Sequence, residues 1–179
     1  IKYMFPKAHA VAYVMMAFRI AYCKVHFPLS FYAAYFTVRA TEFDAHLIVK
    51  GPSVLRQQLK ELEQKGNNLS AKEKGLQTVF ELALEMFLRG FTFERVDLNK
   101  SSADKFIMKD KSLLPPLASL QGLGTSAALN IVQARGEKEF SSIEDLKVRA
   151  RLSKTVVDIL QEHGCLQGMT ESDQMNLFA

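Results

Sequence analysis

The stretch LQGLGTSAALNIVQAR, residues 120–135, places Gly122 and Gly124 directly before an apolar pattern of helical spacing. Apolar residues flank the two glycines on both sides, at Leu117, Leu120, Leu123, Ala127, Ala128 and Ile131. This pattern predicts a short helix, a tight turn and a second helix. Glycine permits backbone angles that are closed to other residues, and it leaves the amide groups of such a turn uncovered.

The predicted turn has the properties of a phosphate-binding site. The first amides of a helix lack intrahelical partners and carry the positive end of the helix dipole. The arrangement resembles the helix-hairpin-helix motif, which holds a DNA strand by its phosphates without reading bases. A plain helical hairpin with glycine at its turn is the alternative. We expect Leu123 to be a buried wedge between the glycines, and Thr125 and Ser126 to add hydroxyl donors. The expected DNA-binding residues are Gly122, Leu123, Gly124, Thr125, Ser126 and Lys154.

A second helix pair follows between residues 141 and 164. Ser141 with Glu144 has the spacing of a capping box, Ser153 can cap a last helix, and Gly164 ends it. Where glycines would stand, this pair has the sequence LSKT at residues 152–155, so we expect a degenerate second motif with a mainly structural role. Basic residues nearby either contact phosphate or are merely solvated; they are Lys147, Arg149, Arg151 and Lys154.

Composition sets limits on the protein class. With 179 residues, 48% of them hydrophobic, the chain can form one or two small cores and is not disordered throughout. All of the excess positive charge precedes Glu42, which suits a polyanion partner or ordinary solvated positions equally well. Cys23 and Cys165 are far apart and lack zinc spacing, which indicates a reducing compartment, the cytoplasm by default, and no structural metal.

The remaining pattern is largely helical. A helix is expected from about residue 7 to 27, ended by Pro28, and a second from Pro28 to about residue 40. Another helix is expected before Gly66, and the capping box Ser70–Glu73 predicts one more, up to Gly90. Residues 91–114 predict a small hairpin or three short strands around the turn NKSS at residues 99–102. The fold class is therefore mainly α with a small β-hairpin element.

The apolar run at residues 8–27 raises the question of a membrane span. Arg19 and Lys24 lie inside it, and each would cost roughly 2.5–3.5 kcal/mol at a bilayer centre. We therefore expect a buried helix and no membrane partner. By periodicity alone, His9 and Tyr13 in this helix are core residues.

The last residues contain QMNLF at 174–178 in a polar setting. Their spacing is similar to the bacterial sliding-clamp-binding peptide, Gln-Leu-x-Leu-Phe, in which the glutamine bonds at the mouth of a pocket and the Leu-Phe pair fills it. The residues we expect to bind a clamp are Gln174, Met175, Leu177 and Phe178. A frayed tail, or one packed back on the domain, is the alternative.

Four features follow one another along the chain: the segment at residues 2–28, the stretch RVDLNKSSADKF at 95–106, the Gly-Leu-Gly turn and the QMNLF tail. Together they resemble the C-terminal part of the PolC-type DNA polymerase III alpha subunits of low-GC Gram-positive bacteria. The resemblance covers essentially the whole chain. It implies fingers-type helices followed by a double helix-hairpin-helix domain that binds duplex or primer-template DNA.

The resemblance also assigns residues and domains. It implies that Tyr13 stacks beside the nascent base pair, that Lys7 and His9 lie close to the incoming deoxynucleoside triphosphate, and that Phe5 lines the same pocket. We expect fingers-like helices at 1–45, a helical linker with the β element at 46–111, the DNA-binding domain at 112–168 and a clamp-binding tail at 169–179. The implied location is the replisome in the cytoplasm.

Catalysis is not expected from this chain alone. Polymerases of this family transfer a nucleotidyl group with two metal ions held by palm aspartates, and the sequence has no paired-aspartate motif of that kind. The resemblance implies that Mg²⁺ and its ligands lie upstream in a longer protein. Two other hypotheses stay open: a non-enzymatic adaptor that couples DNA to a clamp, and a helical interaction module whose glycines only turn the chain.

Overall fold

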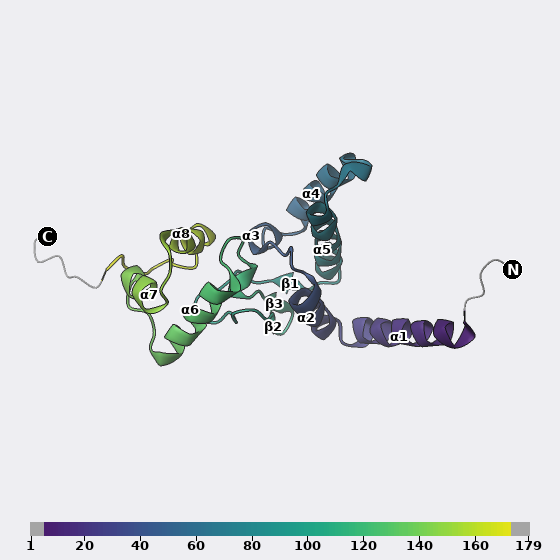
Figure 1. Ribbon diagram of the computed structural model, residues 1–179, viewed down its shortest axis with the longest axis horizontal. Helices are drawn as coiled ribbons and strands as arrows, with labels where there is room; N and C mark the ends of the chain where they lie inside the picture. Colours follow the sequence, from purple (N-terminus) through teal and green to yellow (C-terminus); the bar gives the residue numbers. More distant parts are fainter. Residues whose placement is uncertain (1–5, 173–179) are drawn as a thin grey trace, which may run out of the picture.

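The computed structural model describes residues 6–172, apart from the side chain of Asn67, and is mainly helical (Figure 1). The first half contains α1 (Lys7–His26), α2 (Pro28–Arg39), α3 (Ala45–Ile48), α4 (Pro52–Gln64), the 3₁₀ turn η1 (Gly66–Asn68) and α5 (Ala71–Leu88). The second half contains β1 (Thr92–Phe93), β2 (Ile107–Met108), β3 (Ser112–Leu114), the 3₁₀ turn η2 (Leu117–Ser119), α6 (Thr125–Glu137), α7 (Ile143–Arg149) and α8 (Lys154–His163).

Proline and capping chemistry set the first helix ends as predicted. Pro28 lacks an amide donor and begins α2, so the chain bends by 118° between α1 and α2. At the start of α5, the Ser70 hydroxyl accepts from the Glu73 amide and the Glu73 carboxylate accepts from the Ser70 amide, which confirms the capping box. The leucines on the inner face of α4, Leu55, Leu59 and Leu62, are buried.

The exposure of α1 differs from the prediction of a buried helix. None of its residues, all of which the structure describes, is buried. Tyr13 is 64% exposed and Phe18 is 72% exposed, so these residues are not core residues of this chain. Figure 1 shows the reason, because α1 extends away from the body. Its C-terminal end reaches α5, where Lys24 pairs with Glu85 at 2.6 Å.

No single helix among residues 6–172 is long and apolar enough to cross a bilayer. The helices α1 and α2 meet that criterion only when they are counted together, across their 118° bend.

The sheet is small and joins segments far apart in sequence. β3 lies between β1, which runs parallel to it, and β2, which is antiparallel to it. The three short strands are thus confirmed, but the predicted hairpin turn at residues 99–102 is wrong. The hairpin connects β2 to β3, where the amide of Lys109 donates to the carbonyl of Ser112 at 2.9 Å. Residues 97–101 instead form a loop in which the Asp97 carboxylate accepts from two following amides.

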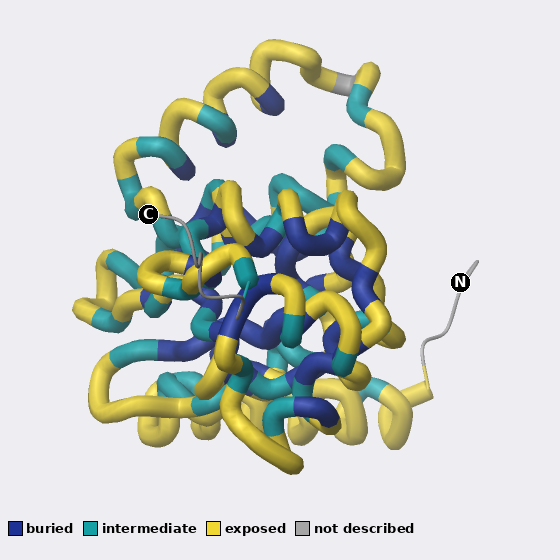
Figure 2. The backbone as a smooth tube through the Cα atoms, turned by 90° about the vertical axis from the view of Figure 1, so that its left-hand side faces the viewer, coloured by how far each residue is buried: buried dark blue, intermediate teal, exposed yellow. Residues whose placement is uncertain are grey.

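The core is continuous from α2 to α8, and its buried segments gather in the middle of the molecule (Figure 2). Four phenylalanines join α2 to the sheet, with ring centroids 4.8 to 6.4 Å apart: Phe36, Phe43, Phe93 and Phe106. Side chains tie the last helices to this body as well. Arg135 of α6 donates to the carbonyls of Leu98 and Ser101, both at 2.7 Å, so α6 is fixed against the 97–101 loop.

Candidate nucleic-acid interface

The Gly-Leu-Gly turn connects η2 to α6 and has the conformation that the sequence predicts. Its first helix is only a 3₁₀ turn, shorter than the helix we expected. Gly122 lies at φ +88°, a left-handed conformation that favours glycine. A Cβ added there would lie 2.9 Å from Cδ1 of Ile159 on α8. Leu123 is fully buried beneath the turn, as expected for a wedge.

The N-terminus of α6 faces solvent beside this turn. Gly124 is its N-cap, and among the described residues no side chain caps this end. The first helical hydrogen bond joins the amide of Ala128 to the carbonyl of Gly124 at 3.1 Å, so the amides of Thr125 and Ser126 precede it. Both residues are exposed. Exposed amides, two hydroxyls and the positive end of the helix dipole suit a phosphate oxygen.

The second hairpin, α7 and α8, repeats the first at an offset of 29 positions. Arg151 takes the place of Gly122 and also has a positive φ, +53°. Leu152 takes the place of Leu123 and is likewise buried. The predicted register of this turn, with residues 152–155 in place of the glycines, is therefore wrong by one position. The predicted capping box is also displaced, because the Ser142 hydroxyl, and not Ser141, accepts from the amide of Asp145.

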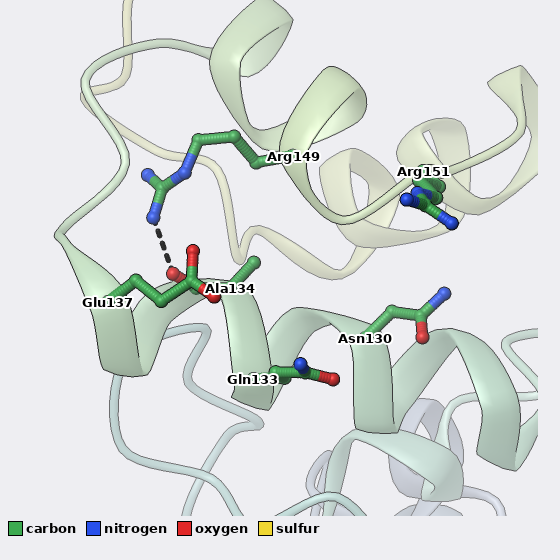
Figure 3. Close-up of a pocket in the computed structure, with 6 residues that line it drawn as sticks. All are labelled: Asn130, Gln133, Ala134, Glu137, Arg149 and Arg151. Atoms are coloured by element: carbon green, nitrogen blue, oxygen red, sulfur yellow. Dashed lines mark hydrogen bonds between the residues drawn. The ribbon is translucent and has the colours of Figure 1, made fainter.

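Basic residues on the second hairpin fall into two kinds. Lys154 is the first residue of α8, and it is exposed, as are Lys147 and Arg151. Arg149 instead points back to the end of α6, where it donates to backbone carbonyls (Figure 3). Arg149 is thus neither a free phosphate contact nor a solvated residue, the two alternatives that the sequence left open.

A polar groove of about 330 Å³ separates the two hairpins. Figure 3 shows its walls, which α6 forms on one side and α7 with the following turn on the other. The groove is lined by Asn130, Gln133, Ala134, Glu137, Arg149 and Arg151.

Buried polar groups hold α8 against the sheet region. Nε2 of His163 accepts from the amide of Val96 at 3.2 Å, which requires a neutral ring. Burial lowers the pKa of His163, and the charges of His46 and Arg95 lower it further, against the opposite effect of Asp44. Beside it, the Cys165 thiol donates to the carbonyl of Val96.

The residues predicted to bind nucleotide lie far from the hairpins. Lys7, His9 and Tyr13 are exposed on α1, at the opposite side of the molecule from α7 and α8 (Figure 1). The rings of His9 and Tyr13 meet edge to face with centroids 4.4 Å apart. Phe5 lies outside the described residues, as do the predicted clamp-binding residues Gln174, Met175, Leu177 and Phe178. Within residues 6–172, no cluster of three or more His, Cys, Asp or Glu side chains is placed to hold a metal ion.

Sequence reasoning missed the roles of two arginines and the repeat register. Arg135 and Arg149 both donate to backbone carbonyls, which carry no sequence signal. The one signal was the i, i+4 spacing of Asp145 and Arg149, which form an ion pair. The repeat was detectable, because Leu117, Leu123 and Ile131 recur as Leu146, Leu152 and Leu160 at the same offset.

Geometry and burial together describe a helix-hairpin-helix domain, and a comparison with protein families agrees. Residues 90–175 match the family described as "Helix-hairpin-helix motif". The fold class predicted from the sequence, mainly α with a small β element and this motif, is confirmed to that extent.

Curated relatives identify the larger protein to which the chain is similar. It is 58% identical over 178 residues to "DNA polymerase III PolC-type" of Oceanobacillus iheyensis, covering 99% of this chain and 12% of that protein. The PolC-type polymerases of Halalkalibacterium halodurans and Bacillus subtilis are each 56% identical, with the same coverage. The chain thus spans about an eighth of the length of these relatives, and the predicted resemblance to PolC-type polymerases is confirmed.

Proposed function

We propose that the chain binds duplex DNA by its phosphates, as the C-terminal segment of a replicative DNA-directed DNA polymerase. The observation that carries this proposal is the exposed N-terminus of α6, which follows a turn closed by Gly122 and Leu123. Amides and hydroxyls recognise phosphate oxygens and not base edges, so the binding does not depend on DNA sequence. Lys154 at the start of α8 adds a positive charge on the second hairpin.

The polymerase activity belongs to the whole protein in this proposal. The relatives bear the name of a DNA polymerase, and the chain is similar to one segment of them. Nucleotidyl transfer requires Mg²⁺ ions held by aspartates, which we place in the palm, upstream of this segment. The segment acts in the cytoplasm with the replisome, and it supplies binding surfaces and not the catalytic carboxylates.

We also propose that α1 contributes to the incoming-nucleotide pocket. Its exposed apolar residues leave an uncovered helix that suits contact with another part of a polymerase. Lys7 and His9 present donors for phosphate on the same helix as Tyr13, whose exposed ring packs against His9 and leaves most of its surface open to a base pair. Phe5 completes this pocket in the proposal.

The tail is proposed to tether the polymerase to a sliding clamp through Gln174, Met175, Leu177 and Phe178. Deleting residues 174–178 should abolish clamp binding and leave duplex binding unchanged. Surface plasmon resonance on immobilised clamp measures the first, and unchanged clamp affinity would remove this part of the proposal.

Duplex binding is tested with a charge placed at the proposed phosphate site. Ser126 is the second residue of α6, so Ser126→Glu puts a carboxylate among the amides that should meet phosphate. Glutamate is favourable in the first turn of a helix, so the fold should not weaken. Ser53 offers a matched control, because it is also exposed and is the second residue of α4, a helix of the same 13-residue length as α6.

The assay is fluorescence anisotropy of the chain with two labelled duplexes of unrelated sequence, titrated with salt. We expect similar affinities for both, a steep fall with salt, and at least about a tenfold loss for Ser126→Glu, or about 1.4 kcal/mol. Ser53→Glu should bind like the parent chain. Equal losses for the two variants, or strong preference for one duplex, would refute phosphate binding at this turn.

A further inference from the structure

Arg149, near the end of α7, joins the two hairpins (Figure 3). Its guanidinium donates to the carbonyl oxygens of Ala134 in α6 and of Lys138 and Glu139 in the linker that follows; the last two distances are 2.7 and 3.2 Å. It also pairs with the carboxylate of Asp145 at 3.0 Å.

The aromatic ring of Phe140 completes this environment, because the Arg149 Cζ lies 4.8 Å from its centroid. Only 22% of the Arg149 side chain is exposed, and each of its hydrogen bonds goes to a protein group. These partners come from α6, from the linker and from α7, and the contacts therefore fix one hairpin against the other.

The chemistry of the partners suits arginine in particular. The last carbonyls of α6 lack intrahelical partners and carry the negative end of the helix dipole, which a guanidinium neutralises. A planar fork of five donors reaches several carbonyls and a carboxylate at once, whereas lysine offers a single point charge. Partial burial alone would raise the pKa of Asp145, but the Ser141 amide and Arg149 outweigh it and hold that pKa below its usual value.

The position of the second turn depends on these contacts. The two hairpin turns lie at the starts of α6 and α8. The turn proposed to bind phosphate spans residues 121–125, and the second turn, which carries the exposed Arg151 and Lys154, spans residues 150–154. Arg149 lies directly before the second turn, and its anchor, Ala134, lies in the last turn of α6. A change in the angle between α6 and α7 would therefore move one turn relative to the other.

We propose that Arg149 is a positioning residue that holds the two hairpin turns at the separation at which both contact one duplex. This inference rests on the proposed duplex binding. Two weak contacts on one rigid body bind far more tightly than either alone, because the second forms at a high effective concentration. Loosening the hairpins would remove that advantage while leaving each contact intact.

A distance measurement tests the positioning without DNA. Nitroxide labels are placed at Ser126→Cys and Thr155→Cys, both exposed, in a Cys23→Ser background. Cys165, which is only partly buried, is replaced as well by Cys165→Ser, which keeps a donor for the carbonyl of Val96. Pulsed electron paramagnetic resonance should give one narrow distance for the parent chain and a broad distribution for Arg149→Met, which keeps the apolar stem but loses every donor.

Two further variants protect the interpretation of this measurement. Lys60→Met removes a positive charge from an exposed site on α4 and should leave the distance narrow. Arg149→Lys keeps the positive charge but loses the planar guanidinium, so it should also broaden the distance distribution. This variant replaces Arg149→Met in the test if Arg149→Met does not fold. A narrow, unchanged distance in folded Arg149 variants would overturn the proposal.

The binding test uses the same variants in two backgrounds. We expect Arg149→Met to lower duplex affinity about tenfold or more in the parent chain. In a chain that already carries Arg151→Ala and Lys154→Ala, Arg149→Met should lower duplex affinity by only about threefold or less. The second turn then has no basic side chain left for Arg149 to position. An equal loss in both backgrounds would refute positioning. Failure of the parent chain to bind duplex would refute the proposed function instead, while the distance measurement would still decide whether Arg149 fixes the hairpins.

Discussion

Replacing Gly122 with alanine tests why the first hairpin turn requires glycine. The residue lies at φ +88°, and a left-handed conformation costs a residue with a Cβ roughly 1–2 kcal/mol. The new methyl group would also lie 2.9 Å from Cδ1 of Ile159. That atom ends a flexible side chain, so relieving the overlap should cost about 1 kcal/mol, at the low end for overpacking. The expected total destabilisation of Gly122→Ala is about 2–3 kcal/mol.

Thermal unfolding followed by circular dichroism measures this cost. In a protein of this size, 1 kcal/mol shifts Tm by about 2–4 °C, so Gly122→Ala should lower Tm by about 4–12 °C. Gly136 in α6 provides the matched control, because its added Cβ meets nothing within 4 Å. Gly136→Ala should raise stability by up to about 1 kcal/mol, because alanine favours the helix more than glycine does.

Ile159→Val separates the two contributions to the cost at Gly122, because valine lacks Cδ1. In that background, Gly122→Ala should cost about 1 kcal/mol less, and the backbone strain should remain. A Tm within about 1 °C of the parent for Gly122→Ala would refute the reasoning altogether. An equal cost in both backgrounds would refute the contact with Ile159 alone.

Three other predictions concern α8, α6 and α1. The pKa of His163 is lowered in the folded state, so below about pH 6.5 the unfolded chain binds a proton that the folded chain excludes. Stability in urea should therefore fall from pH 7 to about pH 5, and His163→Gln should flatten that dependence while lowering stability at pH 7. Arg135→Ala leaves two carbonyls of the 97–101 loop without their donor and should cost about 2–3 kcal/mol in urea unfolding, whereas a loss under about 0.5 kcal/mol would contradict its structural role. Tyr13→Ala should change the stability of this chain by less than about 0.5 kcal/mol, because the ring is exposed, and should raise the KM for nucleotide in a full-length polymerase. An unchanged KM would remove Tyr13 from the proposed nucleotide pocket.

Local chemistry explains which parts of the fold were predictable. Pro28 and the Ser70–Glu73 capping box set helix ends through groups within a few residues, so the sequence predicts them well. The exposure of α1 was not predictable, because an apolar pattern identifies a helix without saying what covers it. The β hairpin was misplaced for a related reason. Polar residues at 99–102 resemble a hairpin turn, but Asp97 holds that loop in another conformation from within, and Arg135 fixes it from α6.

At the candidate site, the prediction of a hairpin turn rested on glycine. Glycine marks only the first of the two hairpins. The second hairpin reaches a positive φ with Arg151, so this turn does not need glycine for its backbone conformation alone. What both hairpins share is the buried leucine after that position, Leu123 in one and Leu152 in the other.

The difference between the two turns lies in their surroundings. At Gly122 the left-handed conformation coincides with the close approach of Ile159 from α8, so a side chain is excluded on two grounds. Arg151 is exposed and lines the groove between the hairpins, where a long basic side chain has room. Glycine in the first turn therefore reflects the packing of the second hairpin against it. In the proposed complex with duplex DNA, the first turn offers a phosphate its backbone amides, while the second offers the charges of Arg151 and Lys154.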